Sequence, residues 1–209
     1  MYFSLIPDIE YDEKPISYPF SESDFVTAKN FFRRYKLNED VFSYAVFFSK
    51  YAIEDGERPD SLADRAYGNP FYDWVILLTN NMVNVQYDWP MTNYQISKVL
   101  ESEYDDAYST IHHYETKKIG QYEAGLRVDE AFYNAQHKIN DNGTISIVNG
   151  SAICGAVTVA DHFYRENEKK REIYLLKPSF FQSFVDDFRR KNLYKKDANY
   201  ISQRLKKTG

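Results

Sequence analysis

The sequence has little of several features that mark common functional classes. Its one cysteine, Cys154, excludes an intrachain disulfide framework and a cysteine-based zinc cluster, and fits a reducing cytoplasm. Its apolar runs stay well below the ~20 residues that a transmembrane helix needs, so no membrane contact is expected. Residues 1–15 have neither a basic segment nor an apolar core, so they predict no secretory signal.

The motifs of common enzymes are absent as well. There is no glycine-rich phosphate loop, no HExxH and no GxSxG. The carboxylate pairs at 105–106 and 186–187 fall on polar helix faces, whereas general acid–base catalysis needs two carboxylates in different environments facing one cleft. The sequence therefore predicts no enzyme, no catalytic residue, no cofactor and no small-molecule substrate.

Four histidines, His112, His113, His137 and His162, are candidates for metal ligands. Adjacent residues of a strand point to opposite faces, so His112 and His113 are not expected to bind one metal in regular geometry. A site that adds His162 and Glu115 is conceivable, but structural or exposed histidines are favoured. We therefore predict no metal site.

Tyrosine and phenylalanine are abundant, with 19 and 15 residues. Tyrosine combines a large apolar body with a polar tip, which suits protein interfaces, although a core that favours aromatics explains the same numbers. Trp74 lies on an apolar stripe and is expected in the core. Trp89 lies in a proline-flanked loop and is a candidate for an exposed contact.

Charge is distributed unevenly along the sequence. Residues 165–209 contain 13 basic and 6 acidic residues, whereas the preceding 164 contain 13 and 25. The basic clusters at 189–191, 195–196 and 206–207 would suit non-specific phosphate binding, so a nucleic-acid binder is one interpretation. The protein as a whole is acidic, however, and these cations alternate with Phe, Leu and Tyr at helical spacing. A solvated helix face or a dock for an acidic neighbour is favoured, and no nucleic-acid partner is expected.

The clearest pattern, at residues 44–81, predicts a strand followed by two helices. Aromatic and β-branched residues at 44–53 predict the strand, and Glu54-Asp55-Gly56-Glu57 predicts the turn after it. Pro59 begins a helix that ends at Gly68 in the left-handed conformation.

Asn69 and Pro70 are the expected cap and first residue of the second helix, which ends at Asn80-Asn81. Its expected buried face consists of Phe71, Trp74, Val75 and Leu78.

This stretch carries a family resemblance. D-G-E-x-P-x-x-L-A-x-x-x-Y-G at 55–68, followed by a Trp-bearing helix that ends in Asn-Asn, resembles a LysM module. More narrowly, residues 51–81 resemble the small LysM-like baseplate wedge protein of T-even-like contractile-tailed bacteriophages. The segments at 88–90, 112–115 and 167–171 resemble the same family, so the resemblance extends over roughly three quarters of the sequence.

The resemblance implies a structural protein of the virion that joins neighbouring wedges of a tail baseplate around the central hub. It implies wedge and hub proteins as partners, several copies in a symmetric assembly, and assembly in the host cytoplasm. The turns of the LysM-like unit, the loop at 88–90 and an exposed arginine pair would then be protein contacts. The residues expected there are Asp55, Gly56, Tyr67, Gly68, Asn69, Asn80, Asn81, Trp89, Pro90, Arg33 and Arg34.

The alternative is a LysM-type module that binds peptidoglycan glycans. Its groove would lie between the turn at Asp55-Gly56 and the helix end at Asn80-Asn81. A module that grips the cell wall would need export, for which residues 1–15 give no signal. The sequence therefore favours assembly over glycan binding.

The rest of the sequence completes an α+β fold with an N-terminal arm. Three prolines in residues 1–24 predict an extended arm without helix, and residues 30–37 predict a strand that exposes Arg33-Arg34. Thr92 and Gln95 predict the capping box of a helix that ends near Ala107.

The C-terminal part is expected to contain a small antiparallel sheet and a terminal helix. Strand patterns lie within 111–116, 137–148 and 156–159, with a hairpin turn at Asp141-Asn142-Gly143 and a second turn at Asn149-Gly150. A turn or short helix at 166–172, a strand at 173–177, a helix at 180–192 and a frayed tail at 193–209 follow. The predicted division is an arm and strand at 1–40, a LysM-like domain at 41–107 and an α+β region at 108–209.

Overall fold

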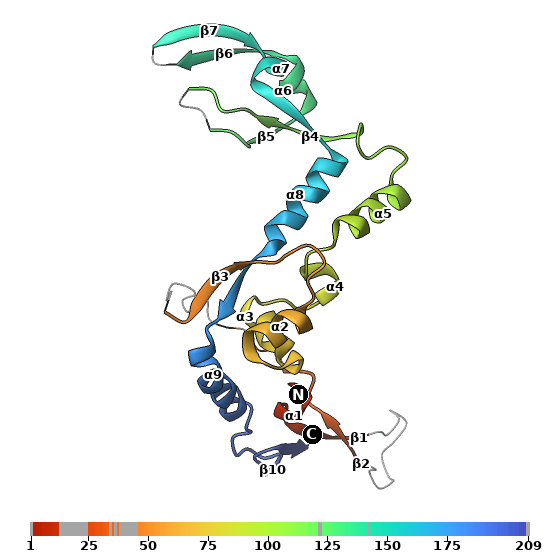
Figure 1. Cartoon of the computed structure of the whole chain (residues 1–209), viewed down its shortest axis with the longest axis vertical. Coiled ribbons are helices and arrows are strands. Elements are labelled where there is room, and N and C mark those ends of the chain that lie inside the picture. The colour runs from red at the N-terminus through yellow and green to blue at the C-terminus, as the bar shows by residue number, and fades with distance from the viewer. Residues whose placement is uncertain are drawn as a thin grey trace. The chain divides into compact units, whose positions relative to one another are not determined.

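The computed structural model describes residues 2–12, 25–33, 35, 37, 46–120, 123–141 and 143–207. These residues form a mixed α+β structure, as the sequence predicts (Figure 1). The protein divides into two compact units: unit 1 is residues 1–89 with 172–209, and unit 2 is residues 90–171. Each of the predicted segments 41–107 and 108–209 contains residues of both units. That these two segments fold separately stays a prediction. Within the described ranges, no helix has both the length and the apolar character to cross a membrane.

The centre of unit 1 is a two-stranded antiparallel sheet with two helices. β3 (Phe48–Ala52) pairs with β9 (Glu172–Leu176), a strand far along the sequence. α2 (Pro59–Tyr67) and α3 (Asp73–Thr79), joined by the 3-10 turn η2 (Pro70–Tyr72), share buried clusters with both strands. Leu62, Val75 and Ile76 are fully buried, and burying each of them adds about 1.5–3 kcal/mol to folding. The short helix α4 (Val85–Asp88) follows.

The predicted turn and the predicted bounds of the first helix are confirmed, whereas the second α-helix begins at Asp73, after a 3-10 turn, and not at Pro70. Gly68 ends α2 with a φ of 71° and donates its N–H to the Asp64 carbonyl, while the Asn69 side chain accepts from the Phe71 N–H at 2.9 Å. The predicted buried face is wrong at Phe71, which is 57% exposed. The cause is η2, whose tighter winding turns Phe71 outward, and Ile76 is buried instead.

α9 (Pro178–Lys191) adds the aromatic face that its spacing predicts. Phe188 lies 4.9 Å from Trp74 between ring centroids, and Phe181 stacks on Tyr67 at 4.7 Å. Trp74 is 6% exposed, so its predicted place in the core is confirmed. The helix begins two residues before the predicted start at 180, with Pro178 at its first position.

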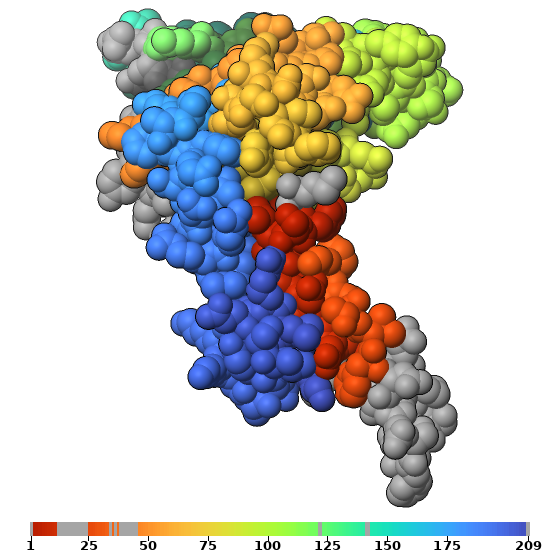
Figure 2. Space-filling model, turned by 60° about the horizontal axis from the view of Figure 1, so that its bottom comes forward, coloured from red at the N-terminus to blue at the C-terminus, as the bar shows by residue number. Residues whose placement is uncertain are grey.

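A four-stranded sheet joins segments from both ends of the sequence. Its order is β10-β11-β1-β2, and β1 pairs parallel with β11 and antiparallel with β2. Figure 2 shows the N-terminal strands, in red and orange, lying against the dark-blue C-terminal segment. The strands are β1 (Asp8–Asp12), β2 (Phe25–Lys29), β10 (Tyr200–Ser202) and β11 (Leu205–Lys207).

Three predictions for the two ends of the protein are wrong within the described residues. Tyr2–Leu5 form the helical turn α1, because the first proline comes only at residue 7. Phe31 and Phe32 form a turn after β2 instead of continuing a strand. Residues 200–207 form a hairpin instead of a frayed tail, because β1 supplies partners for their backbone groups. The rest of the predicted arm, at 13–24, lies outside the described residues.

Unit 2 combines helices with two separate antiparallel sheets, where one small sheet was expected. The first has the order β5-β4-β8, and the second is the hairpin β6-β7. Its helical core contains Ile96, Leu100 and Val159. The elements are α5 (Asn93–Glu103), β4 (Ile111–Thr116), β5 (Arg127–Val128), α6 (Glu130–Asn134), β6 (Gln136–Asp141), β7 (Thr144–Asn149), α7 (Gly150–Ile153), β8 (Cys154–Thr158) and α8 (Val159–Arg171).

The predictions for unit 2 are correct for a capping box and a hairpin, and they differ from the structure at three other places. The Thr92–Gln95 capping box and the hairpin around Gly143 are both present. α5 ends at Glu103 rather than near Ala107, and Gly150 begins the helical turn α7 rather than a simple turn. The predicted turn or short helix at 166–172 is the second half of a longer helix, α8, which begins at Val159 and ends at Arg171.

Candidate functional site

Four of the residues predicted as protein contacts lie exposed at turns of unit 1: Asp55, Gly56, Gly68 and Asn81. The last three have φ values of 80°, 71° and 54°, the left-handed conformation that ends or reverses an element. Asn69 is half-buried, and its side chain caps η2. These turns present backbone groups at the surface, and their role as contacts stays a prediction.

The side chains of Tyr67 and Asn80, by contrast, are used inside unit 1. The Tyr67 hydroxyl donates to the Leu176 carbonyl at 3.2 Å, and burial raises its pKa to about 12. Asn80 Nδ2 donates to the Tyr174 carbonyl at 2.9 Å, and Asn80 Oδ1 accepts from the Tyr174 N–H at 2.8 Å. The Asn80 amide thus continues the sheet pairing at β9 and ties α3 to that strand.

Trp89 is not an exposed contact, and this prediction is wrong. Its indole is 7% exposed and packs with Ile53 and Leu62. The indole N–H donates to the Glu57 carbonyl at 2.8 Å, so the loop folds back onto the turn after β3. Pro90 is buried as well, so the prediction that it is a contact residue on an exposed loop is also wrong.

Arg33 is half-buried, and its side chain contacts the C-terminal end of α9. Its guanidinium donates to the Asn192 carbonyl at 2.9 Å and lies 5.4 Å from the centre of the Tyr194 ring. A cation at this position stabilises a helix C-terminus, where unpaired carbonyls carry partial negative charge. Its neighbour Arg34 lies outside the described residues.

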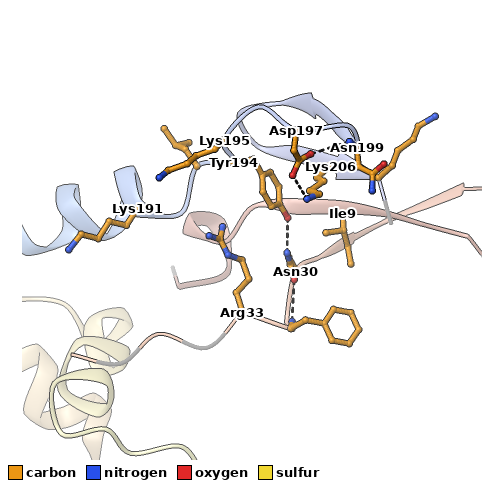
Figure 3. A pocket seen from close by; sticks show the side chains of 12 residues that line it. Ile9, Asn30, Arg33, Lys191, Tyr194, Lys195, Asp197, Asn199 and Lys206 are labelled. Carbon is orange, nitrogen blue, oxygen red and sulfur yellow. Dashed lines mark hydrogen bonds and ion pairs between the residues drawn. The ribbon is translucent and has the colours of Figure 1, made fainter. Parts of the chain in front are cut away.

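Arg33 also lines a basic hollow of about 680 Å³ in unit 1 (Figure 3). We call it the basic hollow. Its walls come from the end of α9, the four-stranded sheet and the loop between them. Asn30 Nδ2 donates to the Tyr194 hydroxyl at 2.7 Å across its floor. The lining residues are Ile9, Asn30, Phe32, Arg33, Lys191, Leu193, Tyr194, Lys195, Asp197, Asn199, Lys206 and Lys207.

The basic hollow is strongly positive because its lining holds five cations and one carboxylate. That carboxylate, Asp197, pairs with Lys206, whose ammonium group holds the pKa of Asp197 below its usual range. Lys191 pairs with Asp187 on its own helix at 2.9 Å, and Lys195 is exposed. For the C-terminal cations the sequence left two interpretations open, a solvated helix face or a dock for an acidic neighbour, and the pairing of β1 with β11 that gathers them has no sequence signal.

Exposed apolar side chains occur in both units. Phe31 and Phe32, in the turn after β2, are 65% and 86% exposed, and Phe32 is at the edge of the basic hollow. In unit 2, Ile145 and Ile147 alternate along β7 and are 68% and 65% exposed. Residues two apart on a strand share a face, so the two isoleucines form one apolar stripe.

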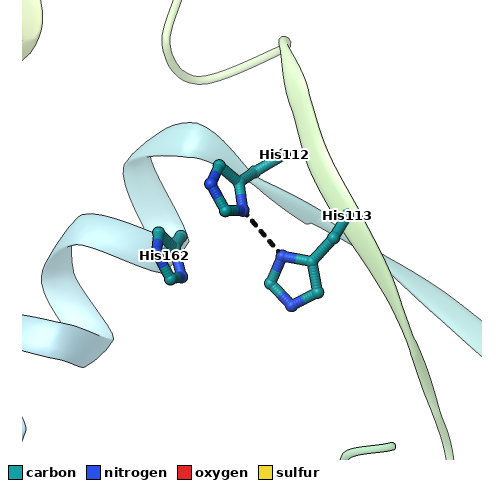
Figure 4. Close-up of side chains that lie close together, drawn as sticks. All are labelled: His112, His113 and His162. Carbon is teal, nitrogen blue, oxygen red and sulfur yellow. Dashed lines mark hydrogen bonds between the residues drawn. The ribbon is translucent and has the colours of Figure 1, made fainter. Parts of the chain in front are cut away.

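The third feature is a histidine cluster in unit 2, formed by His112, His113 and His162 (Figure 4). His112 and His113 come from β4 and His162 from α8. The Nδ1 atoms of His112 and His113 are 2.8 Å apart, and the His112 and His162 rings stack at 4.0 Å between centroids. One ring nitrogen from each residue lies within 4.8 Å of the others.

A β-bulge explains how adjacent histidines of one strand meet. The pairing of β4 with β8 shifts register between Ile111 and His113, so the regular alternation of faces is interrupted there. The sequence argument against a shared site assumed regular strand geometry. That assumption is wrong for this strand.

A carboxylate and an arginine support the cluster from one side. Glu115 Oε1 lies 2.9 Å from His113 Nε2, and Glu115 Oε2 accepts from Arg165 at 2.8 Å. These two partners hold the pKa of Glu115 below its usual range. Burial, together with the neighbouring His162 and His113, lowers the pKa of His112, so its neutral form is favoured at neutral pH.

Comparison with known proteins identifies the family. A family model described as base plate wedge protein 53 matches residues 1–191. Baseplate wedge protein gp53 of Enterobacteria phage T4 is 28% identical over 202 residues, which cover 90% of this protein and 93% of the phage T4 protein. The resemblance predicted from the sequence is confirmed at the level of the family. The chain belongs to the base plate wedge protein 53 family, structural proteins of the phage virion's tail baseplate.

Proposed function

We propose that the protein is a non-enzymatic connector that joins neighbouring wedges of the baseplate around its hub, in several copies, through protein contacts. The observation that carries the proposal is the family match over residues 1–191. The basic hollow, the exposed turns of unit 1 and the exposed apolar side chains supply the surfaces that such a connector needs.

Unit 1 has the arrangement that a LysM-like connector module would have. β3, α2, α3 and β9 follow one another as strand, helix, helix and strand, and the two strands pair antiparallel. We take this set as a LysM-like unit in which residues 90–171 are inserted between the second helix and the second strand. The insertion would leave the turns at Asp55-Gly56 and Gly68 available for contacts, as in an uninterrupted module.

The occupant that best fits the basic hollow is an acidic segment of a neighbouring baseplate protein. Its five cations against one carboxylate favour carboxylate side chains or a terminal carboxylate of the partner. Phe32 at the edge is 86% exposed, and burying an aromatic side chain of this kind gives a typical interface anchor. Charge would then select the partner, and the phenylalanine would supply contact area.

Glycan binding is not part of the proposal. An exposed indole that stacks on a sugar ring is the usual means of holding a pyranose, and both tryptophans of the protein, Trp74 and Trp89, are at most 7% exposed. Tyr67 and Asn80, next to the proposed glycan groove, direct their side chains to β9. The observed use of these residues supports a packing role.

Charge reversal in the basic hollow tests the proposal. We expect Lys191→Glu with Lys195→Glu to lower incorporation of the protein into baseplates at least about tenfold, because like charges across an interface cost more than the ~1.4 kcal/mol that a tenfold change requires. Incorporation is measured by quantifying the protein in purified particles from cells in which the variant replaces the wild type. Raised salt should weaken the wild-type interaction with isolated partner proteins.

A matched control reverses two exposed lysines of unit 2, Lys98 and Lys118. This variant has the same net charge as the test variant and should incorporate normally. Equal incorporation of both variants at the wild-type level would overturn the role of the basic hollow. Particles that assemble normally without the protein would overturn the connector function as a whole.

A further inference from the structure

The histidine cluster of unit 2 has the donor set of a transition-metal site. Three imidazoles suit Zn²⁺ and related divalent first-row ions, and a three-histidine set with one open position is a known zinc arrangement. In tetrahedral geometry, Zn–N bonds of 2.0–2.1 Å place two ligand nitrogens about 3.3 Å apart. The 2.8 Å between His112 Nδ1 and His113 Nδ1 is somewhat shorter than that spacing, and His162, which stacks on His112, has a ring nitrogen within 4.8 Å of the others, so the rings turn toward a common point when they bind the ion.

The hydrogen bond from His113 Nε2 to Glu115 leaves the lone pair of His113 Nδ1 available to bind a metal. An ionised Glu115 only accepts hydrogen bonds, so His113 Nε2 carries the proton and donates it to Glu115 Oε1. His113 Nδ1 therefore keeps its lone pair and faces the other two histidines. A ligand histidine that donates its second N–H to a carboxylate is the usual support of a metal site, because it fixes the tautomer and raises the basicity of the ligand.

The second support is the arginine that holds this carboxylate. Arg165 is three residues after His162 on α8, so one helical turn supplies both a ligand and the partner of Glu115. His113 is 8% exposed at its side chain, which restricts the ring to this orientation. His112 and His113 also line an open hollow of about 610 Å³, which gives an ion a path to the cluster.

We propose that His112, His113 and His162 bind one divalent transition-metal ion, Zn²⁺ first among them, with Glu115 as the carboxylate that orients His113. Water completes the coordination in the isolated protein. The ion replaces the contact between the two Nδ1 atoms, and His112 becomes its Nε2–H tautomer, so no net proton release is needed. Its effect is to tie β4 to α8 within unit 2.

The test uses the full-length protein without a histidine tag, first stripped with chelator. Titration with ZnCl2 should give one ion per molecule by calorimetry and by elemental analysis after dialysis. At a hundredfold excess of free Zn²⁺ over its Kd, the melting temperature of unit 2 should rise by about 10–20 °C. MgCl2 should have no effect, because Mg²⁺ prefers oxygen ligands, and Co²⁺ should give the visible absorption of a tetrahedral site.

Variants separate the proposed ligands from general effects on the unit. His162→Ala and His113→Ala should each weaken Zn²⁺ binding at least about 100-fold, and Glu115→Gln should weaken it about 10- to 100-fold. His137→Ala is the matched control, since His137 belongs to the same unit but its Nε2 lies 2.7 Å from the Phe132 carbonyl oxygen, away from the cluster. Circular dichroism of the metal-free variants checks their folding, and His162→Gln replaces any alanine variant that does not fold.

The outcomes divide clearly. One bound Zn²⁺ that is lost in the His113 and His162 variants and kept in the His137 variant supports the site. Failure of the stripped wild-type protein to bind Zn²⁺, or binding that is unchanged in His113→Ala and His162→Ala, overturns it. The measurements use the isolated protein, so their result is independent of the proposed role in assembly.

Discussion

The two units of this protein obtain their cohesion in different ways. Unit 1 has two buried apolar clusters with many aromatic rings, and its sheets pair strands from distant parts of the sequence. Unit 2 has one smaller cluster, and its hairpin β6-β7 pairs neighbouring segments. The comparison indicates that unit 1 depends on both ends of the sequence being present, whereas unit 2 is one continuous segment.

The units share one device, an asparagine amide that ties a helix to an extended segment. In unit 1, Asn80 bonds both the N–H and the carbonyl of Tyr174. In unit 2, Asn167 Nδ2 donates to the Met91 carbonyl at 3.0 Å, and Asn167 Oδ1 accepts from the Met91 N–H at 2.7 Å. Each amide bonds the N–H and the carbonyl of one residue, as a neighbouring strand would. In both units, one side chain thus supplies the hydrogen-bond partners of an extended backbone segment.

The tryptophans make the two units separable by spectroscopy. Trp74 and Trp89, the two tryptophans of the protein, both belong to unit 1, so tryptophan fluorescence reports the unfolding of that unit. Far-UV circular dichroism reports both units. Coincident transitions of the two probes in every variant below would contradict the distinction between the units.

The largest expected effect comes from truncating the buried cores. Ile76→Ala in α3 and Leu100→Ala in α5 remove side chains that are at most 1% exposed. Each should cost about 2–5 kcal/mol in the free energy of unfolding of its own unit, through lost burial and the cavity left behind. Ile76→Ala should shift the fluorescence transition of unit 1 in urea. Leu100→Ala should leave that transition unchanged and shift only the part of the circular dichroism transition that comes from unit 2.

Gly150→Ala should destabilise unit 2 by about 1–3 kcal/mol or more through overpacking. A Cβ at this position would lie 2.2 Å from the Phe132 carbonyl oxygen and 2.5 Å from that of Tyr133, and backbone cannot easily move away. Gly155→Ala is the control in the same unit, because its nearest neighbour would be the flexible end of Lys117 at 3.5 Å. Equal dichroism melts for the two variants would count against this close approach of α6 and α7.

Removing the asparagine ties should cost somewhat less. Asn167→Ala and Asn80→Ala should each cost about 1–3 kcal/mol, because backbone groups of Met91 or Tyr174 lose their partner. Asn167 should be the more costly, since it is 5% exposed and water reaches the freed groups less easily. Urea titration followed by both probes should assign each loss to its own unit; a loss in the other unit would contradict the assignment.

Gly68→Ala should have the smallest effect, about 1 kcal/mol on unit 1, because a residue with a Cβ is strained when φ is held at 71°. The space around a Cβ is open, so no clash adds to this cost. Gly68→Asn is the matched control, since asparagine tolerates the left-handed conformation better. An alanine variant as stable as the wild type in the fluorescence melt would contradict a conformational cost at this residue.

Local signals in the sequence predicted the segment from β3 to α3 well. Proline at the start of α2, Gly68 at its end and the Asn69 cap act over a few residues, so they can be recognised without knowledge of the fold. The same holds for the capping box at Thr92 and the hairpin at Gly143.

Features that depend on distant partners were not predictable in the same way. The pairing of β1 with β11 extends over three residues of each strand, too few to leave a periodic pattern in the sequence, so the basic hollow that it creates was not expected. Trp89 looked exposed because its loop contains a proline, and its burial depends on packing with Ile53 and Leu62 and on the hydrogen bond to the Glu57 carbonyl. The bulge in β4 that joins His112 to His113 likewise depends on the register of β8.

The most direct test of the connector proposal is a photo-cross-link from the basic hollow inside assembled baseplates. A photoreactive phenylalanine analogue replaces Phe32, at the edge of the hollow, or exposed Tyr94 of α5 as the control. The proposal expects irradiation at position 32 to link the protein to another baseplate protein in assembled particles and not in isolation, at a much higher yield than at position 94. Assembled particles that give no cross-link from position 32 would contradict it.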